Sequence, residues 1–211
     1  MNYIHTIISG SLIILLIFLY KTKNNILLYQ ILKYSLIFNF LSFNGYLIIN
    51  GLFDYKVHLP LHLCYLTELV IFISILFNSK FLYGWLTLNA LGGGITGFTN
   101  SNLLDDALLI EHVHLYLSHF NLLLFSVTVY INRLVILKST LIKSFIFNAV
   151  IFFSVYYYNS LYNTNYWFTH QKPSGVNLTQ LLPDWPYYLL CLIAIGITSY
   201  YFTFKIYTKR I

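Results

Sequence analysis

Residues 61–99 read LHLCYLTELVIFISILFNSKFLYGWLTLNALGGGITGFT. The stretch contains two apolar runs, Leu61–Asn78 and Phe81–Thr99, separated only by Ser79-Lys80. Together they cover 39 residues, far more than the roughly 20 residues that one membrane crossing takes. The stretch therefore predicts two helices that cross a membrane and return as a tight hairpin.

The rest of the chain has the same apolar character. Of its 211 residues, 58% are hydrophobic and only 9% are charged, against roughly 25% charged in a soluble domain. Two cysteines cannot hold together a disulfide scaffold of this size, and 18 Phe and 20 Tyr exclude a disordered chain. The composition predicts a polytopic membrane protein that forms one domain over residues 1–211.

Seven apolar windows, separated by polar residues, are long enough to cross a bilayer. We predict spans at Tyr3–Tyr20, Ile26–Asn50, Leu61–Asn78, Phe81–Thr99, Val113–Leu137, Leu141–Leu161 and Pro186–Phe204. The expected fold class is therefore all-α, a bundle of seven transmembrane helices.

The basic residues indicate which way the bundle faces. Ten of the 12 Lys and Arg residues fall on one side of a seven-span arrangement, and only Lys56 and Lys172 fall on the other. The ten are Lys21, Lys23, Lys33, Lys80, Arg133, Lys138, Lys143, Lys205, Lys209 and Arg210. Cytoplasmic loops carry the excess of Lys and Arg, so we predict the N-terminus outside and the C-terminus inside. Because the bases form no stripe or patch, nucleic acid is not an expected partner.

All seven histidines fall at or near the predicted outer face of the bundle. They are His5, His58, His62, His112, His114, His119 and His170. Imidazole can act as a base, a nucleophile or a ligand, but it is also tolerated at a membrane interface, as Tyr and Trp are. We take His62 and His119 as functional candidates, because both are expected inside the helix ends, where an unpaired polar group is costly.

The third predicted span opens with His58-Leu-Pro-Leu-His62-Leu-Cys64 and continues to Glu68. Pro60 is expected in the first helical turn, where its missing N–H costs nothing. Cys64 and Glu68 are four residues apart and share a face, whereas His62 projects from another. Glu68 is expected near mid-bilayer, where a carboxyl is protonated, hydrogen-bonded to Asn or Tyr, or open to a wet cavity. Cys64 is either a packing residue or a nucleophile.

The fifth predicted span places His119 about two turns into the membrane, at a depth like that of Cys64. Spans three and five therefore predict a Cys–His or His–His constellation in the outer half of the bundle. The spacing matches neither a HExxH helix nor a cysteine-pair zinc site, and no nucleotide-binding or G-x-S-x-G element occurs. We expect no metal and no cofactor.

Glycines are concentrated in the fourth predicted span, at Gly92-Gly93-Gly94 and Gly97. Small residues let helices approach closely in lipid, and they also let a backbone approach a ligand. Close helix packing is the favoured interpretation.

The segment before the last span carries Asn165-Tyr166-Trp167 and Lys172. An outer loop normally avoids Lys. We therefore interpret the segment as a lid over the mouth of the bundle, with Asn165, Tyr166 and Lys172 as substrate contacts and Lys172 offered to a phosphate head group. The aromatic residues around Trp185 fit an interfacial belt.

Three stretches together resemble the YwaF-like family of bacterial integral membrane proteins over nearly the whole chain. The stretches are Leu59-Pro60-Leu61-His62-Leu63-Cys64, Ser118-His119, and Asn165-Tyr166-Trp167 with Lys172-Pro173 ahead of Trp185-Pro186-Tyr187. More distantly, the chain is similar to a vertebrate multipass acyltransferase that remodels ether phospholipids.

The resemblance implies a location in the bacterial plasma membrane, with membrane lipids as partners. It also implies an outer-half active site with a nucleophile on one helix and a histidine on another, His119 first and His62 second. The chain departs from the pattern at Leu61, because the vertebrate relative has a Cys there, just before the His that corresponds to His62.

Three functions remain open from the sequence. The first is a lipid acyltransferase or hydrolase of the outer leaflet, with His119 as general base, His62 or Cys64 as its partner and Lys172 as a head-group contact. The second is a non-catalytic binding or transport protein, in which Glu68 and the outer histidines line a polar cavity. The third is a zinc hydrolase that uses a histidine cluster. The sequence also leaves homo-oligomers open.

Overall fold

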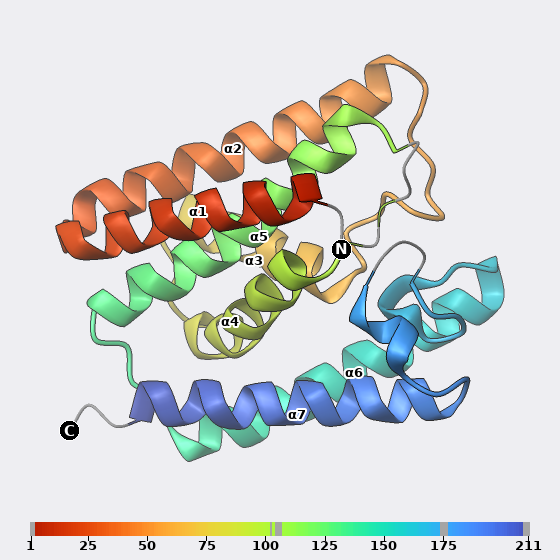
Figure 1. The fold of residues 1–211 in the computed structure, drawn as a ribbon. Helices are drawn as coiled ribbons and strands as arrows, with labels where there is room; N and C mark the ends of the chain where they lie inside the picture. Colours follow the sequence, from red (N-terminus) through yellow and green to blue (C-terminus); the bar gives the residue numbers. More distant parts are fainter. Residues whose placement is uncertain (1–2, 102, 104–106, 174–176, 209–211) are drawn as a thin grey trace.

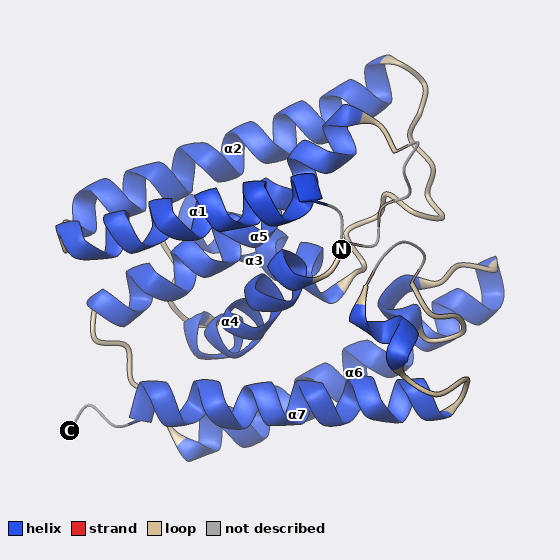
Figure 2. Cartoon of the chain, viewed as in Figure 1, coloured by secondary structure: helices blue, strands red, loops and turns tan. Residues whose placement is uncertain are grey.

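The computed structural model describes residues 3–101, 103, 107–173 and 177–208, and within them every regular element is a helix (Figures 1 and 2). The long helices are α1 (Tyr3–Thr22), α2 (Asn25–Ile49), α3 (Leu63–Leu76), α4 (Tyr83–Thr99), α5 (Leu109–Ile131), α6 (Lys138–Tyr162) and α7 (Tyr187–Thr208). Two short 3-10 helices, η1 (Tyr166–Phe168) and η2 (Leu178–Leu181), lie between α6 and α7. The predicted all-α class is confirmed.

The two chain ends lie at opposite ends of the bundle (Figure 1). We call the end with the N-terminus the loop end, because it also carries the connection between α2 and α3 and the segment between α6 and α7. The loop end corresponds to the predicted outer side. That orientation stays a prediction, and Lys209, Arg210, Asp105 and Asp106, whose charges bear on it, lie outside the described residues.

Five of the helices are long and apolar enough to cross a membrane, namely α1, α2, α5, α6 and α7. The other two, α3 with 14 residues and α4 with 17, are shorter. Both are packed against neighbouring helices, and nine residues of α4 are buried. Seven crossings therefore stay a prediction, while a multipass helical bundle is what the structure has.

The start of the third helix differs from the sequence expectation. Pro60 was expected in the first turn, but α3 begins at Leu63 and His62 has an extended backbone at the N-cap. The preceding turn is held from outside, because the Tyr166 hydroxyl accepts a hydrogen bond from the Leu59 N–H at 3.1 Å. This contact comes from a segment more than 100 residues away, so the local sequence did not reveal it.

Two other boundaries also differ. The predicted fifth span reached Leu137, but α5 ends at Ile131, because Asn132 caps it and Arg133 takes a left-handed backbone with φ of 58°. The hairpin between α3 and α4 uses residues 77–82 rather than Ser79-Lys80 alone.

The glycines of α4 let four helices pack directly on its backbone. A methyl group at Gly84 would lie 2.5 Å from Thr140 of α6, and one at Gly92 would collide with Ser199 of α7. The remaining contacts involve α3 and α5: Gly93 faces Cys64, Gly94 faces Leu123, and Gly97 faces His119. The predicted close helix packing is confirmed.

We expect Gly94→Ala to destabilise the bundle. The added carbon would lie 2.5 Å from Leu123 Cγ and 3.1 Å from the His119 carbonyl oxygen. Overpacking of this kind costs about 1–3 kcal/mol, more than the helix-propensity gain of at most about 1 kcal/mol. Gly196→Ala is the matched control, because nothing lies within 4 Å of its added carbon. Thermal unfolding in detergent should give a lower Tm for Gly94→Ala than for wild type or the control, and equal Tm values for the two variants would contradict the packing argument.

Candidate functional site

Cys64 and His119 lie against consecutive turns of one face of α4. A carbon added at Gly93 would be 3.1 Å from Cys64 Sγ, and one added at Gly97 would overlap the His119 ring. Positions four apart share a helix face about 6 Å apart along the axis. The predicted meeting of the third and fifth helices near the loop end therefore brings a thiol and an imidazole to the same strip of backbone.

The tautomer of His119 follows from its hydrogen bond. Its Nδ1 lies 2.7 Å from the carbonyl oxygen of Leu115, and a carbonyl oxygen only accepts. Nδ1 must therefore carry the proton, which leaves the lone pair of the neutral ring on Nε2. This is the nitrogen nearer to the position that a Gly97 side chain would occupy.

Glu68 lies in a separate polar cluster between α2, α3 and α5, in which Glu68, Asn39 and Asn121 are fully buried. Its Oε1 accepts hydrogen bonds from Asn39 Nδ2 at 3.0 Å and from Asn121 Nδ2 at 2.8 Å. Asn121 Oδ1 in turn accepts from the Ser35 hydroxyl at 2.6 Å, and His114 Nδ1 lies 3.2 Å from Asn39 Oδ1. Of the environments expected for Glu68, the structure selects hydrogen bonding to asparagine.

The expectation that Glu68 bonds to an Asn or Tyr did not say which residues these are, and the structure identifies them as Asn39 and Asn121. His114, Ser118 and Asn121 are spaced by four and three residues, so they share one face of α5. Ser35 and Asn39 are likewise four apart on α2. Polar residues at helical spacing inside apolar spans are the signal that would have found this cluster.

His62 does not meet Cys64 or His119 in the described contacts but packs under the segment between α6 and α7. We call residues 163–173 and 177–186 the cap segment. The His62 ring lies 5.1 Å from the ring of Tyr166 and 5.0 Å from that of Phe168. Its Nδ1 accepts from the Trp167 N–H at 3.3 Å, so the ring contacts the underside of the predicted lid.

Partly buried hydrogen bonds hold the cap segment against the start of α3. The Tyr166 hydroxyl donates to the Tyr55 carbonyl oxygen at 2.8 Å, and Trp167 Nε1 donates to the Leu61 carbonyl oxygen at 2.6 Å. Trp167 keeps a left-handed backbone, with φ of 58°, a conformation that costs of order 1–3 kcal/mol for a non-glycine residue. These contacts hold the segment over the start of α3.

The predicted substrate contacts Asn165 and Tyr166 use their polar atoms within this arrangement. Asn165 Oδ1 accepts from the backbone N–H groups of His170 and Gln171, and its Nδ2 donates to the Gln171 carbonyl oxygen. The Lys172 ammonium donates to the Leu182 carbonyl oxygen at 2.7 Å and to the Asp184 carboxylate at 3.1 Å. All three residues therefore contribute to the fold of the cap segment.

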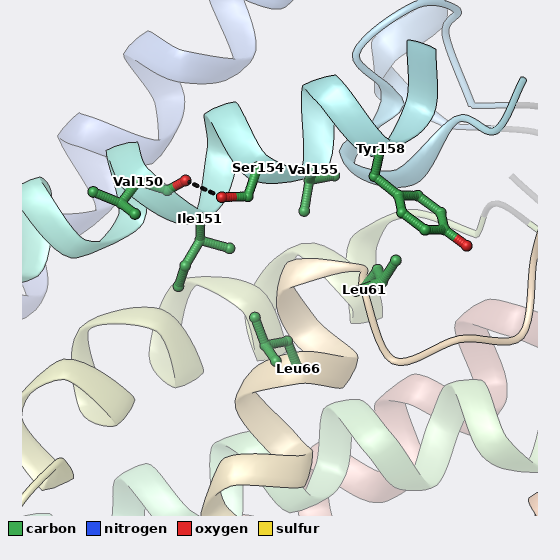
Figure 3. A pocket seen from close by; sticks show the side chains of 7 residues that line it. All are labelled: Leu61, Leu66, Val150, Ile151, Ser154, Val155 and Tyr158. Atoms are coloured by element: carbon green, nitrogen blue, oxygen red, sulfur yellow. Dashed lines mark hydrogen bonds between the residues drawn. The ribbon is translucent and has the colours of Figure 1, made fainter. Parts of the chain in front are cut away.

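An apolar groove of about 280 Å³ opens between the start of α3 and α6 (Figure 3). Its lining comprises Leu61, Leu66, Val150, Ile151, Ser154, Val155 and Tyr158. The Ser154 hydroxyl donates to the Val150 carbonyl oxygen at 2.9 Å, which reduces the polarity of the wall. Leu61 thus faces this groove, whereas Cys64 faces α4. Among the described residues, no three His, Cys, Asp or Glu side chains are close enough to hold a metal ion.

We expect the docking of the cap segment on His62 to weaken as the pH falls. Burial lowers the pKa of His62 from its ordinary 6.5 to about 4, so between these values an undocked His62 binds a proton that the docked one does not. Docking is then fully stable above pH 6.5 and loses stability as the pH falls towards 4.

Hydrogen–deuterium exchange of residues 163–173, corrected for the intrinsic pH dependence of amide exchange, should rise across this window. The rise should be absent in His62→Gln. A rise of equal size in the variant would show that another group controls the cap segment.

Comparison with known proteins shows the family. The model of the TMEM164 family matches residues 1–204 of the 211. No curated protein and no solved structure matches the chain. The narrower resemblance to the YwaF-like bacterial proteins stays a prediction. With its apolar helices and this match over nearly its whole length, the chain is a multipass membrane protein that belongs to the TMEM164 family.

Proposed function

We propose that the protein acts on the acyl chains of lipids in the outer leaflet of a bacterial plasma membrane, with Cys64 as nucleophile and His119 as general base. The observation that supports the proposal is the glycine face of α4, against which the thiol and the imidazole lie one turn apart. In this proposal the N-terminus is outside, the C-terminus is inside, and all seven helices cross the membrane.

The proposed reaction depends on the tautomer of His119, which leaves Nε2 free to act as the base. With Nδ1–H held by the Leu115 carbonyl oxygen, Nε2 takes the proton of the Cys64 thiol as sulfur attacks the ester carbonyl carbon. The bond between this carbon and the lysolipid oxygen breaks, and the imidazolium returns its proton to that oxygen. An acyl thioester remains on Cys64, and water or a second lipid alcohol releases the acyl group by the same steps.

The groove between α3 and α6 fits the apolar part of such a substrate. Five of its seven lining residues are aliphatic (Figure 3). Leu61 and Leu66 of this lining flank Cys64 in the sequence, although the thiol itself faces α4. A groove of this kind within an apolar bundle accommodates a hydrocarbon chain and offers no favourable site to a polar ligand. We assign it to an acyl chain.

The residues of the loop end take supporting roles in this proposal. His62 holds the cap segment through Trp167, and Asn165 and Tyr166 keep that segment folded above the site. A phosphate head group would share the Lys172 ammonium with Asp184. A head-group role for Lys172 therefore requires that lipid binding weaken when Lys172 is replaced.

A second candidate is non-catalytic binding or transport, and the buried cluster around Glu68 favours it. A second buried polar cluster joins α4, α6 and α7, where Trp85 Nε1 donates to Asn148 Oδ1 at 2.7 Å and Asn148 Nδ2 donates to Asn89 Oδ1 at 3.0 Å. Transport would require a continuous polar path, but no hydrogen bond among the described residues joins the two clusters. Lipid chemistry is therefore the better-supported proposal.

Lipid mass spectrometry of the purified protein in mixed phospholipids tests the proposal. Wild type should change the acyl-chain distribution or release free fatty acid. Loss of the general base in His119→Ala should lower the rate by roughly 10²–10⁴-fold, and Cys64→Ser should lower it by roughly a thousandfold or more. Cys191→Ser is the matched control, because Cys191 is the other free cysteine and lies on α7.

Two outcomes of the lipid measurement would contradict this assignment. Turnover that survives in Cys64→Ser but not in His119→Ala would assign the nucleophile to another group. No turnover by folded wild-type protein would favour the binding or transport function.

A further inference from the structure

Glu68 is an acid without a cation in the middle of the bundle. The residue has 0% exposure, and the ion pairs found among the described residues, His58–Glu111 and Lys172–Asp184, do not involve it. A bare carboxylate buried in a membrane bundle costs several kcal/mol or more unless a positive charge or a full set of donors compensates it. The hydrogen-bond donors around Glu68 therefore determine whether its carboxyl is ionised or protonated.

The donors reach only one of the two carboxyl oxygens. Oε1 accepts from both Asn39 and Asn121. Oε2 is inaccessible and has no hydrogen-bond partner among the described residues. The carboxyl thus has one oxygen in the environment of a carbonyl, while the other receives no hydrogen bond of normal geometry and has only the Ser118 hydroxyl nearby. This asymmetry suits a neutral acid whose Oε2 carries the proton, and it does not suit a carboxylate, which shares its charge between both oxygens.

The hydrogen-bond directions in the cluster agree. Both asparagines donate towards Glu68, so their Oδ1 atoms are acceptors, and Asn121 Oδ1 receives the Ser35 hydroxyl proton. Asn39 Oδ1 faces His114 Nδ1, so Nδ1 carries the proton and His114 Nε2 holds a lone pair. The hydrogen bonds of this cluster therefore all donate in the direction of Oε1. Oε2 is the position that can hold one more proton.

The cluster is closed on one side. Towards the end of the bundle opposite the loop end, α2, α3 and α5 continue with fully buried apolar side chains: Leu28, Leu32 and Leu36 of α2, Ile71 of α3, and Leu124 and Phe125 of α5, each at most 1% exposed. Towards the loop end, His114 stacks on Phe43 at 3.9 Å between ring centres, and His58 packs against the same ring at 6.0 Å. The titratable groups therefore lead from Glu68 towards the loop end only.

We propose that Glu68 is a proton-binding site at the centre of the bundle, which holds its proton on Oε2 and exchanges it with the loop end past His114. The O–H bond of Oε2 breaks, His114, which is joined to Glu68 through Asn39, accepts the proton on Nε2, and the imidazolium then releases a proton towards the loop end. The inference does not depend on the proposed lipid chemistry.

The groups that face this site are few. Cys64 and Tyr65 of α3 interact electrostatically with Glu68, and α5 contributes His114, Asn121 and the Ser118 hydroxyl. Helix α2 contributes Asn39 and, through Asn121, the Ser35 hydroxyl, neither of which titrates. A negative charge on Glu68, one turn below Cys64, would oppose a thiolate there, and the bound proton removes that repulsion.

Infrared spectroscopy of the full chain in lipid nanodiscs tests the site directly. At neutral pH, wild type should show the carbonyl-stretch band of a protonated carboxylic acid. The chain has only two glutamates, so Glu68→Gln should lose the band and the matched control Glu111→Gln should keep it. Absence of the band in wild type, or its persistence in Glu68→Gln, would overturn the proposal. Loss of the band on adding sodium ions at constant pH would also overturn it, because the ligand would then be a monovalent cation.

The rate at which the acid exchanges its proton for deuterium tests the route past His114. In D₂O the band should shift as the acid deuterates, and His114→Phe, which keeps a ring on Phe43, should slow this shift by roughly a hundredfold, the low end of what a positioned proton acceptor contributes. His112→Phe is its control, and equal exchange rates in the two variants would overturn the route.

A further variant applies if Glu68→Gln does not fold. Asn121→Leu should then move the band to higher frequency, because Oε1 loses a donor. An unmoved band would show that the acid is not Glu68.

Discussion

The close packing of other helices on the backbone of α4 is the constraint on which the rest of the structure depends. Gly84, Gly92, Gly93, Gly94 and Gly97 leave no room for a side chain where α3, α5, α6 and α7 approach. In lipid, water does not drive helices together, so association relies on close van der Waals contact and on hydrogen bonds between helices. Helix α4 supplies the first of these, and it does so on several sides at once.

The hydrogen bonds between helices form where the packing has already brought the backbones together. Glu68, Asn39 and Asn121 join three helices near the middle of the bundle, while Trp85 and Asn148 help to join α4 to α6. Each cluster pairs its amides within the protein, because an unpaired polar group in an apolar interior is costly. Glu68 Oε2 departs from this rule, as do His5 Nε2 and Ser9 Oγ among the described residues.

The sequence predicted the helices well and the turns poorly. Apolar runs placed all seven helices within a few residues at most ends, because burial in lipid requires continuous apolar helices. Pro60 and the end of α5 were misplaced for different reasons. Tyr166 holds the turn around Pro60 from a distant segment, and Arg133 ends α5 with a left-handed backbone that no periodicity announces. In the candidate site, depth along a helix was enough to place Cys64 and His119 against neighbouring turns of one face of α4, but it did not show that His62 contacts the cap segment.

Composition and periodicity alone therefore established a multipass helical membrane protein, because these properties depend on how each segment meets lipid. They also identified Cys64, His119 and Glu68 as polar residues in apolar surroundings. Only the tertiary structure decided which neighbours these residues have: glycine backbone for Cys64 and His119, two asparagines for Glu68, and the cap segment for His62. Helix rotation and contacts between distant segments set these neighbours, and neither is encoded in the order of residues along a single helix.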